Sequence, residues 1–194
     1  MKYSFLRPTL LAAIALGLTA CGGKASFDLT GPVTGLVYEG LVLSNTKNGD
    51  EVAVPANATT FKLPKSVEYG SEYAVTVKTK PLHQNCLVAN GAETAGRLAS
   101  VSITVNCRLD AYQIGGAITG LNADNLVLVN GSGDRIAIAK GATSYAFQNE
   151  VAYKTSYGVT VLTQPTGQRC SVANGVGEMG DAAVTNINIT CGLG

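Results

Sequence analysis

The sequence predicts an all-β protein, built of two tandem antiparallel β-sandwich domains of about seven strands each, after an N-terminal signal peptide. Two copies of one segment follow each other at an offset of 84 to 85 residues. Within each copy, short runs rich in Val, Ile, Thr and Tyr alternate with turns rich in Gly, Asn, Asp and Pro. No apolar stripe with helical spacing follows residue 21, which favours strands throughout.

Residues 1–20 have the pattern of a secretory signal peptide. Lys2 and Arg7 supply a basic start, and Leu10–Leu18 is an apolar run of nine residues. A helix that crosses a bilayer needs about 20 apolar residues, so this run is too short for a transmembrane span. Its length is that of the apolar part of a signal peptide, and small residues follow it.

The tetrapeptide Leu18-Thr19-Ala20-Cys21 resembles the lipobox of bacterial lipoproteins. The resemblance implies cleavage after Ala20 and acylation of Cys21 with chains such as palmitate, which leaves residues 21–26 as a lipidated tether. Gly22 stands where an Asp would favour retention in the inner membrane, so we expect an outer-membrane protein, on its periplasmic or its surface face. Stable anchoring needs two or more membrane signals, and the lipoprotein pattern supplies several acyl chains.

The duplication divides the rest of the chain into repeat 1, residues 27–108, and repeat 2, residues 109–194. The matching segments are Thr34–Leu36 with Thr119–Leu121, Leu41–Leu43 with Leu126–Leu128, Tyr69–Val77 with Tyr153–Val161, and Cys86–Gly91 with Cys170–Gly175. The link over residues 108–111 is short, so we expect the two domains to lie end to end in a restricted relation.

Repeat 1 shows the strand pattern most clearly. The expected strands are Gly31–Leu36, Leu41–Asn45, Glu51–Val54, Thr59–Leu63, Glu72–Thr79, Cys86–Asn90 and Val101–Cys107. Tyr73, Val75 and Val77 fall on one face of their strand, which is the period of two of a half-buried strand. The same parity places Cys107 on the face of Ile103 and Val105, so its sulfur should point into the core.

Four cysteines remain after Cys21, and in an exported chain they predict two disulfides. Cys86 and Cys107 are 21 positions apart, as are Cys170 and Cys191. Of three pairings, the duplication favours Cys86–Cys107 and Cys170–Cys191, because each copy should carry its own bridge. A zinc site is not expected, because such sites use closely spaced pairs of ligands.

The repeated motifs G-x-V-x-G-L, L-V-L-x-N, Y-x-V-T-V-x-T-x-P-x-x-Q-x-C, V-x-N-G and I-x-V-x-C resemble a tandem repeat of bacterial surface and secreted lipoproteins. The resemblance covers Phe27 to Cys191. It implies immunoglobulin-like or transthyretin-like sandwiches, a choice that the sequence leaves open. Such domains serve as stalks, spacers or binding modules.

Composition gives no case for nucleic acid as a partner. Without the signal peptide the chain has 12 basic and 13 acidic residues and no clustered basic face. His83, the single histidine, falls in a predicted loop and has Gly167 as its counterpart, so we expect a solvated side chain. No catalytic set, metal site or cofactor is expected, and the ligand-binding residues are unknown.

Four tyrosines recur in register in both copies: Tyr69, Tyr73, Tyr153 and Tyr157. We expect them in the core or at sandwich corners. The sequence thus predicts a lipoprotein that is not an enzyme, anchored in the membrane through Cys21, acting as a structural module or with a protein partner at the outer membrane or cell surface. The alternative is a surface module that binds a small ligand or glycan, which an exposed aromatic cluster at the loop ends would favour.

Overall fold

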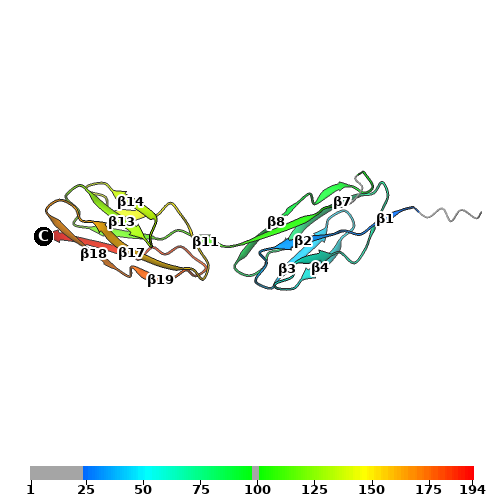
Figure 1. The fold of residues 1–194 in the computed structure, drawn as a ribbon, viewed down its shortest axis with the longest axis horizontal. Helices are drawn as coiled ribbons and strands as arrows, with labels where there is room; N and C mark the ends of the chain where they lie inside the picture. Colours follow the sequence, from blue (N-terminus) through cyan, green and yellow to red (C-terminus); the bar gives the residue numbers. More distant parts are fainter. Residues whose placement is uncertain (1–23, 98–100) are drawn as a thin grey trace, which may run out of the picture.

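The computed structural model describes residues 24–97 and 101–194. This part of the chain consists of strands, turns and loops and contains no helix. It forms two sandwiches that lie end to end, with β1 at one end and the C-terminus at the other (Figure 1). The predicted all-β class with two tandem sandwiches is therefore confirmed, whereas the signal peptide and Cys21 lie outside the described residues.

The first sandwich, which extends from Ser26, just before repeat 1, to Leu109, just after it, has ten strands among the described residues. They are β1 (Ser26–Phe27), β2 (Thr30–Thr34), β3 (Leu41–Asn45), β4 (Asp50–Val54), β5 (Thr60–Lys62), β6 (Val67–Glu68), β7 (Glu72–Thr79), β8 (Gln84–Ala89), β9 (Ala92–Thr94) and β10 (Thr104–Leu109). The short strands β1, β6 and β9 are those that the sequence pattern did not indicate. Too few residues form them to show an alternation.

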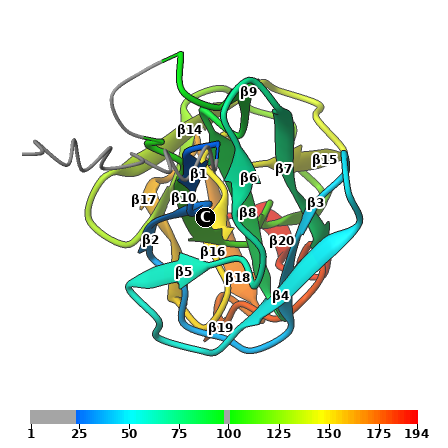
Figure 2. The same ribbon diagram turned by 90° about the vertical axis from the view of Figure 1, so that its right-hand side faces the viewer.

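Repeat 2 forms the same series in the same order. Its strands are β11 (Ala111–Tyr112), β12 (Gly115–Thr119), β13 (Leu126–Asn130), β14 (Asp134–Ile138), β15 (Ser144–Ala146), β16 (Val151–Ala152), β17 (Ser156–Thr163), β18 (Gln168–Ala173), β19 (Val176–Glu178) and β20 (Asn188–Leu193). Figure 2 looks along the long axis, onto the end of repeat 1 that carries β1 and β6.

Each sandwich has two four-stranded sheets and one short pair. The sheets of repeat 1 have the orders β5-β2-β10-β8 and β4-β3-β7-β9, and those of repeat 2 have the orders β15-β12-β20-β18 and β14-β13-β17-β19. All pairs are antiparallel except β2 with β10 and β12 with β20. In a constant-type immunoglobulin sandwich the first two strands are neighbours in one sheet. Here β2 and β3 lie in different sheets, so the strand order differs from that type.

Apolar side chains that alternate along the strands fill a separate core in each repeat. Leu41, Leu43 and Ile103 in repeat 1 are fully buried, as are their counterparts Leu126, Leu128 and Ile187. The expected strand over 101–107 begins only at Thr104, and the Ile103 carbonyl just before it lies close to Gly31 of β2. Its alternation is nonetheless correct, since Ile103, Val105 and Cys107 all face the core.

The motif V-x-N-G is where the chain passes from one sheet to the other, from β8 to β9 and from β18 to β19. Asn90 and Asn174 have φ values of 56° and 58°, in the left-handed region that asparagine tolerates. The following Gly91 lies against the Val75 carbonyl, where a Cβ would come within 2.3 Å of the oxygen. Glycine is therefore required at this crossing.

Candidate functional site

Both expected disulfides are present, Cys86–Cys107 and Cys170–Cys191. Each joins residues directly opposite each other in an antiparallel pair, and the cysteines are buried in the cores. We expected Cys86 to open its strand and Cys107 to end its own. Instead, the ladder runs two residues further, to the pair Gln84 and Leu109.

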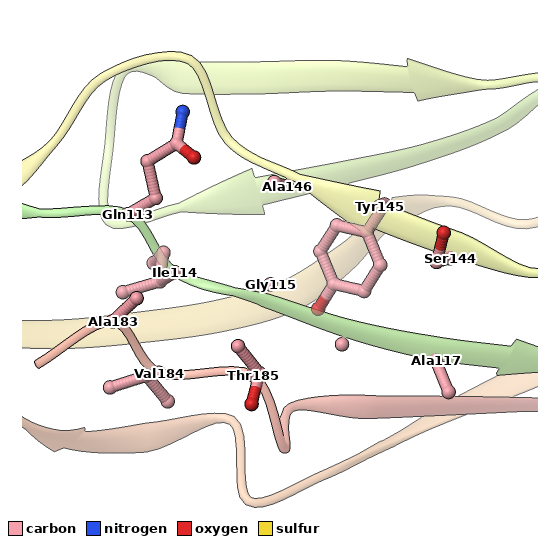
Figure 3. A pocket seen from close by; sticks show the side chains of 11 residues that line it. Gln113, Ile114, Gly115, Ala117, Ser144, Tyr145, Ala146, Ala183, Val184 and Thr185 are labelled. Atoms are coloured by element: carbon pink, nitrogen blue, oxygen red, sulfur yellow. The ribbon is translucent and has the colours of Figure 1, made fainter.

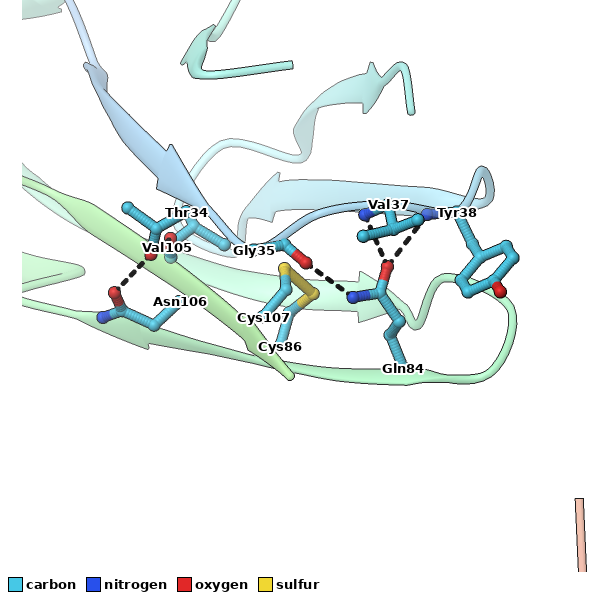
Figure 4. The surroundings of a disulfide bond; sticks show 9 residues. All are labelled: Thr34, Gly35, Val37, Tyr38, Gln84, Cys86, Val105, Asn106 and Cys107. Carbon is cyan, nitrogen blue, oxygen red and sulfur yellow. Dashed lines mark hydrogen bonds between the residues drawn. A yellow bond between two sulfur atoms is a disulfide. The ribbon is translucent and has the colours of Figure 1, made fainter. Parts of the chain in front are cut away.

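Gln84, at the end of this ladder, also bonds to a segment outside it. Its side chain is buried and joins the disulfide hairpin to the loop between β2 and β3 (Figure 4). The Gln84 Oε1 accepts hydrogen bonds from the N–H groups of Val37 and Tyr38 at 2.8 and 2.9 Å, and Nε2 donates to the Gly35 carbonyl at 2.6 Å. The sequence signal was a glutamine repeated in both copies, but its role depends on a loop 46 to 49 residues away.

Gln168 makes equivalent hydrogen bonds to the loop of repeat 2, and we call each such set of bonds a glutamine bracket. It accepts from the Asn122 N–H and donates to the Gly120 carbonyl, both at 2.8 Å. Gly35 and Gly120, the glycines of the repeated T-G-L motif, have φ values of 72° and 78°. A Cβ at either one would lie within 2.2 to 2.3 Å of the carbonyl oxygen of the bridged Cys107 or Cys191, so the loop passes directly over the disulfide strand.

A single residue, Asp110, separates β10 of repeat 1 from β11 of repeat 2. The Asp110 N–H donates to the carbonyl of His83 in repeat 1 at 2.9 Å. Its carbonyl accepts from the N–H of Tyr153 in repeat 2 at 2.8 Å. The connection is thus bonded to both sandwiches, which restrains their relative orientation.

His83 is the central side chain of this junction. Its ring stacks on Tyr153 with centroids 4.0 Å apart and planes at 4°, and Tyr38 meets it edge-on at 5.2 Å. The His83 Nδ1 lies 2.5 Å from the Asp181 Oδ1. The expectation of a solvated loop histidine was wrong, because repeat 2 covers the ring. These contacts suit a surface that joins two sandwiches.

Charge at the junction also acts on nearby groups. Partial burial raises the pKa of Tyr112 above its ordinary value, and the carboxylates of Asp110 and Asp181 raise it further. The hydrogen bond from Lys154 to Glu178 raises the pKa of that lysine, and the charge of Glu178 adds to the effect. The Tyr112 hydroxyl and the Lys154 ammonium therefore both lose their protons less readily than isolated side chains of the same kind.

The four repeated tyrosines have different surroundings. Tyr73 is buried, and Tyr157 packs partly buried against the core of repeat 2. Tyr153 is covered by His83 and Tyr38 at the junction. Tyr69 is 61% exposed, so it does not lie in the core. No preceding sandwich covers it in the described chain.

A groove of about 320 Å³ opens on repeat 2 between β12, β15 and residues 183–185 (Figure 3). Gly115, Gly116 and Ala117 of β12 line it, and the lining as a whole is mostly apolar. Below it, the buried hydroxyl of Tyr145 donates to the Ile187 carbonyl at 2.9 Å. Burial raises the pKa of Tyr145 to about 12.

Repeat 1 has larger side chains at three of the corresponding positions. Gly115, Ala117 and Ala146 correspond to Thr30, Pro32 and Lys62. Lys62 also pairs with Asp28 across this face, with Nζ and Oδ2 2.6 Å apart. The groove of repeat 2 thus lies where three positions carry smaller side chains than in repeat 1.

The described residues hold no group of three or more His, Cys, Asp or Glu side chains placed to bind a metal ion. Over residues 24–97 and 101–194, no helix is long and apolar enough to cross a membrane.

No protein-family model matches the sequence, and no curated protein matches it. Among solved structures, the chain is similar to the pilus adhesin SpaC from Lactobacillus rhamnosus GG, with 12% identity and a TM-score of 0.33. That alignment covers 87% of this chain and 31% of the adhesin, so the chain spans about a third of the adhesin's length. It is also similar to the shaft pilin SpaA of the same organism, with 12% identity, a TM-score of 0.26, and 86% and 99% of the two chains covered.

Proposed function

We propose that the chain is an exported lipoprotein, held in the outer membrane through acylated Cys21, that serves as a structural or protein-interaction module at the outer membrane or cell surface. The resemblance of Leu18–Cys21 to a lipobox supports the anchor, and Gly22 supports the outer membrane. Only Gly22 and Gly23 separate Cys21 from Lys24, the first described residue. Repeat 1 would therefore stand next to the membrane and repeat 2 beyond it.

The junction carries the structural part of this proposal. A single connecting residue bonded to both sandwiches, and a histidine ring stacked across the gap, restrain bending between the repeats. The two sandwiches then form a short rod that holds the far end of repeat 2 away from its anchor. A flexible linker would leave that distance undefined.

Labelling with an alkyne analogue of palmitate tests the anchor. The full chain expressed in a diderm bacterium should take up label and sediment with outer membranes, and Cys21→Ala should do neither. Ser171→Ala, on the exposed face of β18 in repeat 2, is the control and should behave as the wild type. Labelling of the Cys21→Ala chain would contradict the anchor, and protease added to intact cells would show which face the rod occupies.

Small-angle scattering tests the rod. His83→Gly introduces the residue that repeat 2 has at position 167, and it should widen the distribution of distances between the repeats because the stack and the contact with Asp181 are lost. Gly167→His, at the far end of repeat 2, is the control and should leave the profile unchanged. An unchanged profile for His83→Gly would contradict a junction held by this ring.

A second candidate function is the binding of a small ligand, and the groove of repeat 2 is the observation that favours it. Its volume of about 320 Å³ lies at the lower end of the range for small-molecule sites. Its lining would suit a mostly apolar molecule with a polar group within reach of Ser144 or Gln113. The aromatic cluster that would favour a glycan site is instead packed between the repeats.

Ala146→Lys introduces the side chain that repeat 1 has at the corresponding position, Lys62, and should fill the groove. The probe is anilinonaphthalene sulfonate, whose fluorescence should rise with the folded wild type and not with the variant. Ser171→Lys, on the exposed face of β18, is the control and should bind the dye as the wild type does. Failure of the folded wild type to bind the dye would count against this candidate.

A further inference from the structure

We propose that the free end of repeat 1 rests on the membrane surface, with the Tyr69 ring in the headgroup layer and Lys24 and Arg97 beside it. This end, which we call the front end, consists of Lys24, Glu68, Tyr69 and Arg97. It lies at the end of the rod that carries β1 and β6, opposite repeat 2 (Figures 1 and 2). The inference rests on the proposed anchoring through Cys21 and adds a second, direct contact with lipid.

Repeat 2 shows that this end of a sandwich is built as a contact surface. The Tyr153 N–H donates to the Asp110 carbonyl, and the Tyr69 N–H donates in the same way to the Ala25 carbonyl at 2.7 Å. Tyr153 is then covered by His83 of the preceding repeat. Tyr69 has the same backbone setting, but its side chain is left exposed.

The Tyr69 ring is held in place. It lies over Gly96, where a Cβ would come within 2.3 Å of the ring, and Gly96 itself has a φ of 85°. A glycine at that position therefore makes room for the ring. An exposed aromatic ring fixed in this way can insert into a neighbouring surface with little loss of side-chain freedom.

The length of the tether identifies the occupant of the front end. Three steps along the chain separate Cys21 from Lys24, so their Cα atoms are at most about 11 Å apart. The headgroup layer on each side of a bilayer is roughly 5–7 Å thick. An acylated Cys21 lies at this layer, which leaves little room for another folded protein between the front end and the lipid.

The chemistry of the front end fits that layer. Tyrosine is enriched at membrane–water interfaces, where its ring and hydroxyl meet apolar and polar surroundings together. Lys24 and Arg97 lie in exposed ion pairs with Glu68 and Glu93 at 3.6 and 3.4 Å. Such exposed pairs are weak, so the two cations can turn to lipid phosphates.

The residue at one repeated position, Asp181 in repeat 2 and Arg97 in repeat 1, agrees with a lipid surface as the partner of the front end. Asp181, which meets His83 at the junction, corresponds to Arg97 in repeat 1. The carboxylate that contacts His83 in repeat 2 is thus replaced by the guanidinium of Arg97 at the front end. A cation there favours phosphate groups as the neighbour.

The chain contains no tryptophan, so a single Trp can report on each surface. Three variants carry it: Tyr69→Trp at the front end, Leu82→Trp beside the junction and Leu193→Trp near the C-terminus. Leu82 and Leu193 are both exposed. The mature chain is coupled through the Cys21 thiol to a maleimide lipid in vesicles of phosphatidylethanolamine and phosphatidylglycerol, so that the test does not depend on acylation in the cell.

Quenching by a lipid brominated near its headgroup should reduce Tyr69→Trp fluorescence several-fold more than that of the other two variants. Combining Tyr69→Trp with Lys24→Glu and Arg97→Glu should shift the equilibrium between lipid-bound and free Trp about 30-fold toward the free state and so weaken the quenching, as expected when two cations no longer attract anionic lipid. Equal quenching of all three variants would mean that the rod lies flat and would overturn the inference. Absence of quenching at position 69 would overturn it as well, while failure of acylation in cells would count only against the proposed anchor.

Discussion

Repeat 1 and repeat 2 share a strand order, a disulfide register and the loop that passes over each bridge, but they differ where side chains meet something outside their own core. Ala146 and Ala117 line a groove in repeat 2, whereas repeat 1 has Lys62 and Pro32 at these positions. The Tyr69 side chain is exposed, whereas His83 stacks on the ring of Tyr153. Positions kept in both copies therefore maintain the sandwich, and positions that differ define its surfaces.

A third difference concerns the edge strands β8 and β18. Gln164 covers the edge of β18 by accepting from the Cys170 N–H at 2.7 Å and donating to the Cys170 carbonyl at 3.1 Å. Lys80 is its counterpart in repeat 1 and has no acceptor for the Cys86 N–H. The Cα atoms of Cys86 and Cys107 are 4.0 Å apart, which is the short spacing of an antiparallel pair without mutual hydrogen bonds. The N–H and carbonyl of Cys86 therefore point away from β10, toward the open edge of β8.

Removal of either disulfide should have the largest effect. Replacing both Cys86 and Cys107, or both Cys170 and Cys191, with Ala should lower the free energy of unfolding of that repeat by about 2–5 kcal/mol. Both bridges span a separation of 21 residues and occupy the same register, so the two losses should be alike. Repeat-resolved hydrogen exchange in urea measures each loss, and clearly unequal values would break the equivalence of the repeats.

The glutamine brackets should differ in strength between the repeats. Gln84→Ala removes the buried side chain to which two loop N–H groups and one carbonyl are bonded. It should lower the free energy of unfolding by about 2–3 kcal/mol. Gln168→Ala removes two bonds from a less buried side chain and should cost about 1 kcal/mol. The same exchange experiment measures both, and an equal cost would show that burial of Gln84 adds nothing.

Exchanging the residues at the edges should shift stability in opposite directions. Lys80→Gln provides an acceptor for the Cys86 N–H and should stabilise repeat 1 by about 1 kcal/mol, whereas Gln164→Lys should destabilise repeat 2 by about 1–2 kcal/mol. Thermal unfolding of each single variant and of the double exchange gives the values. A destabilised Lys80→Gln chain would mean that the edge of β8 is satisfied in another way.

The smallest effect concerns Tyr145, for which repeat 1 has Phe61. Tyr145→Phe removes the bond to the Ile187 carbonyl and should cost about 1 kcal/mol at neutral pH. Because burial raises the pKa of Tyr145 from 10.0 to about 12, its contribution to stability is complete below pH 10 and is lost as the pH rises toward 12. Urea unfolding of repeat 2 across this range should show a larger loss in the wild type than in Tyr145→Phe, in which Tyr112 still titrates with a raised pKa.

Much of the fold could be predicted because its signals are local. The alternation of Tyr73, Val75 and Val77 gave β7, and the parity of Cys107 gave the direction of its sulfur. The short strands were missed because two or three residues show no period. The site could not be predicted, since the partners of Gln84 and His83 lie far away in the sequence.

The sequence by itself determined the two copies, their alternating strands and the pairing of their cysteines, because repeat spacing and a period of two are properties of neighbouring residues. Only the tertiary structure decided where Gln84 bonds, which ring His83 meets and where a groove remains. Those outcomes depend on which side chains from distant segments reach one place. A lysine or an alanine at position 62 or 146 is an ordinary surface residue until the fold brings β2 or β12 beside it.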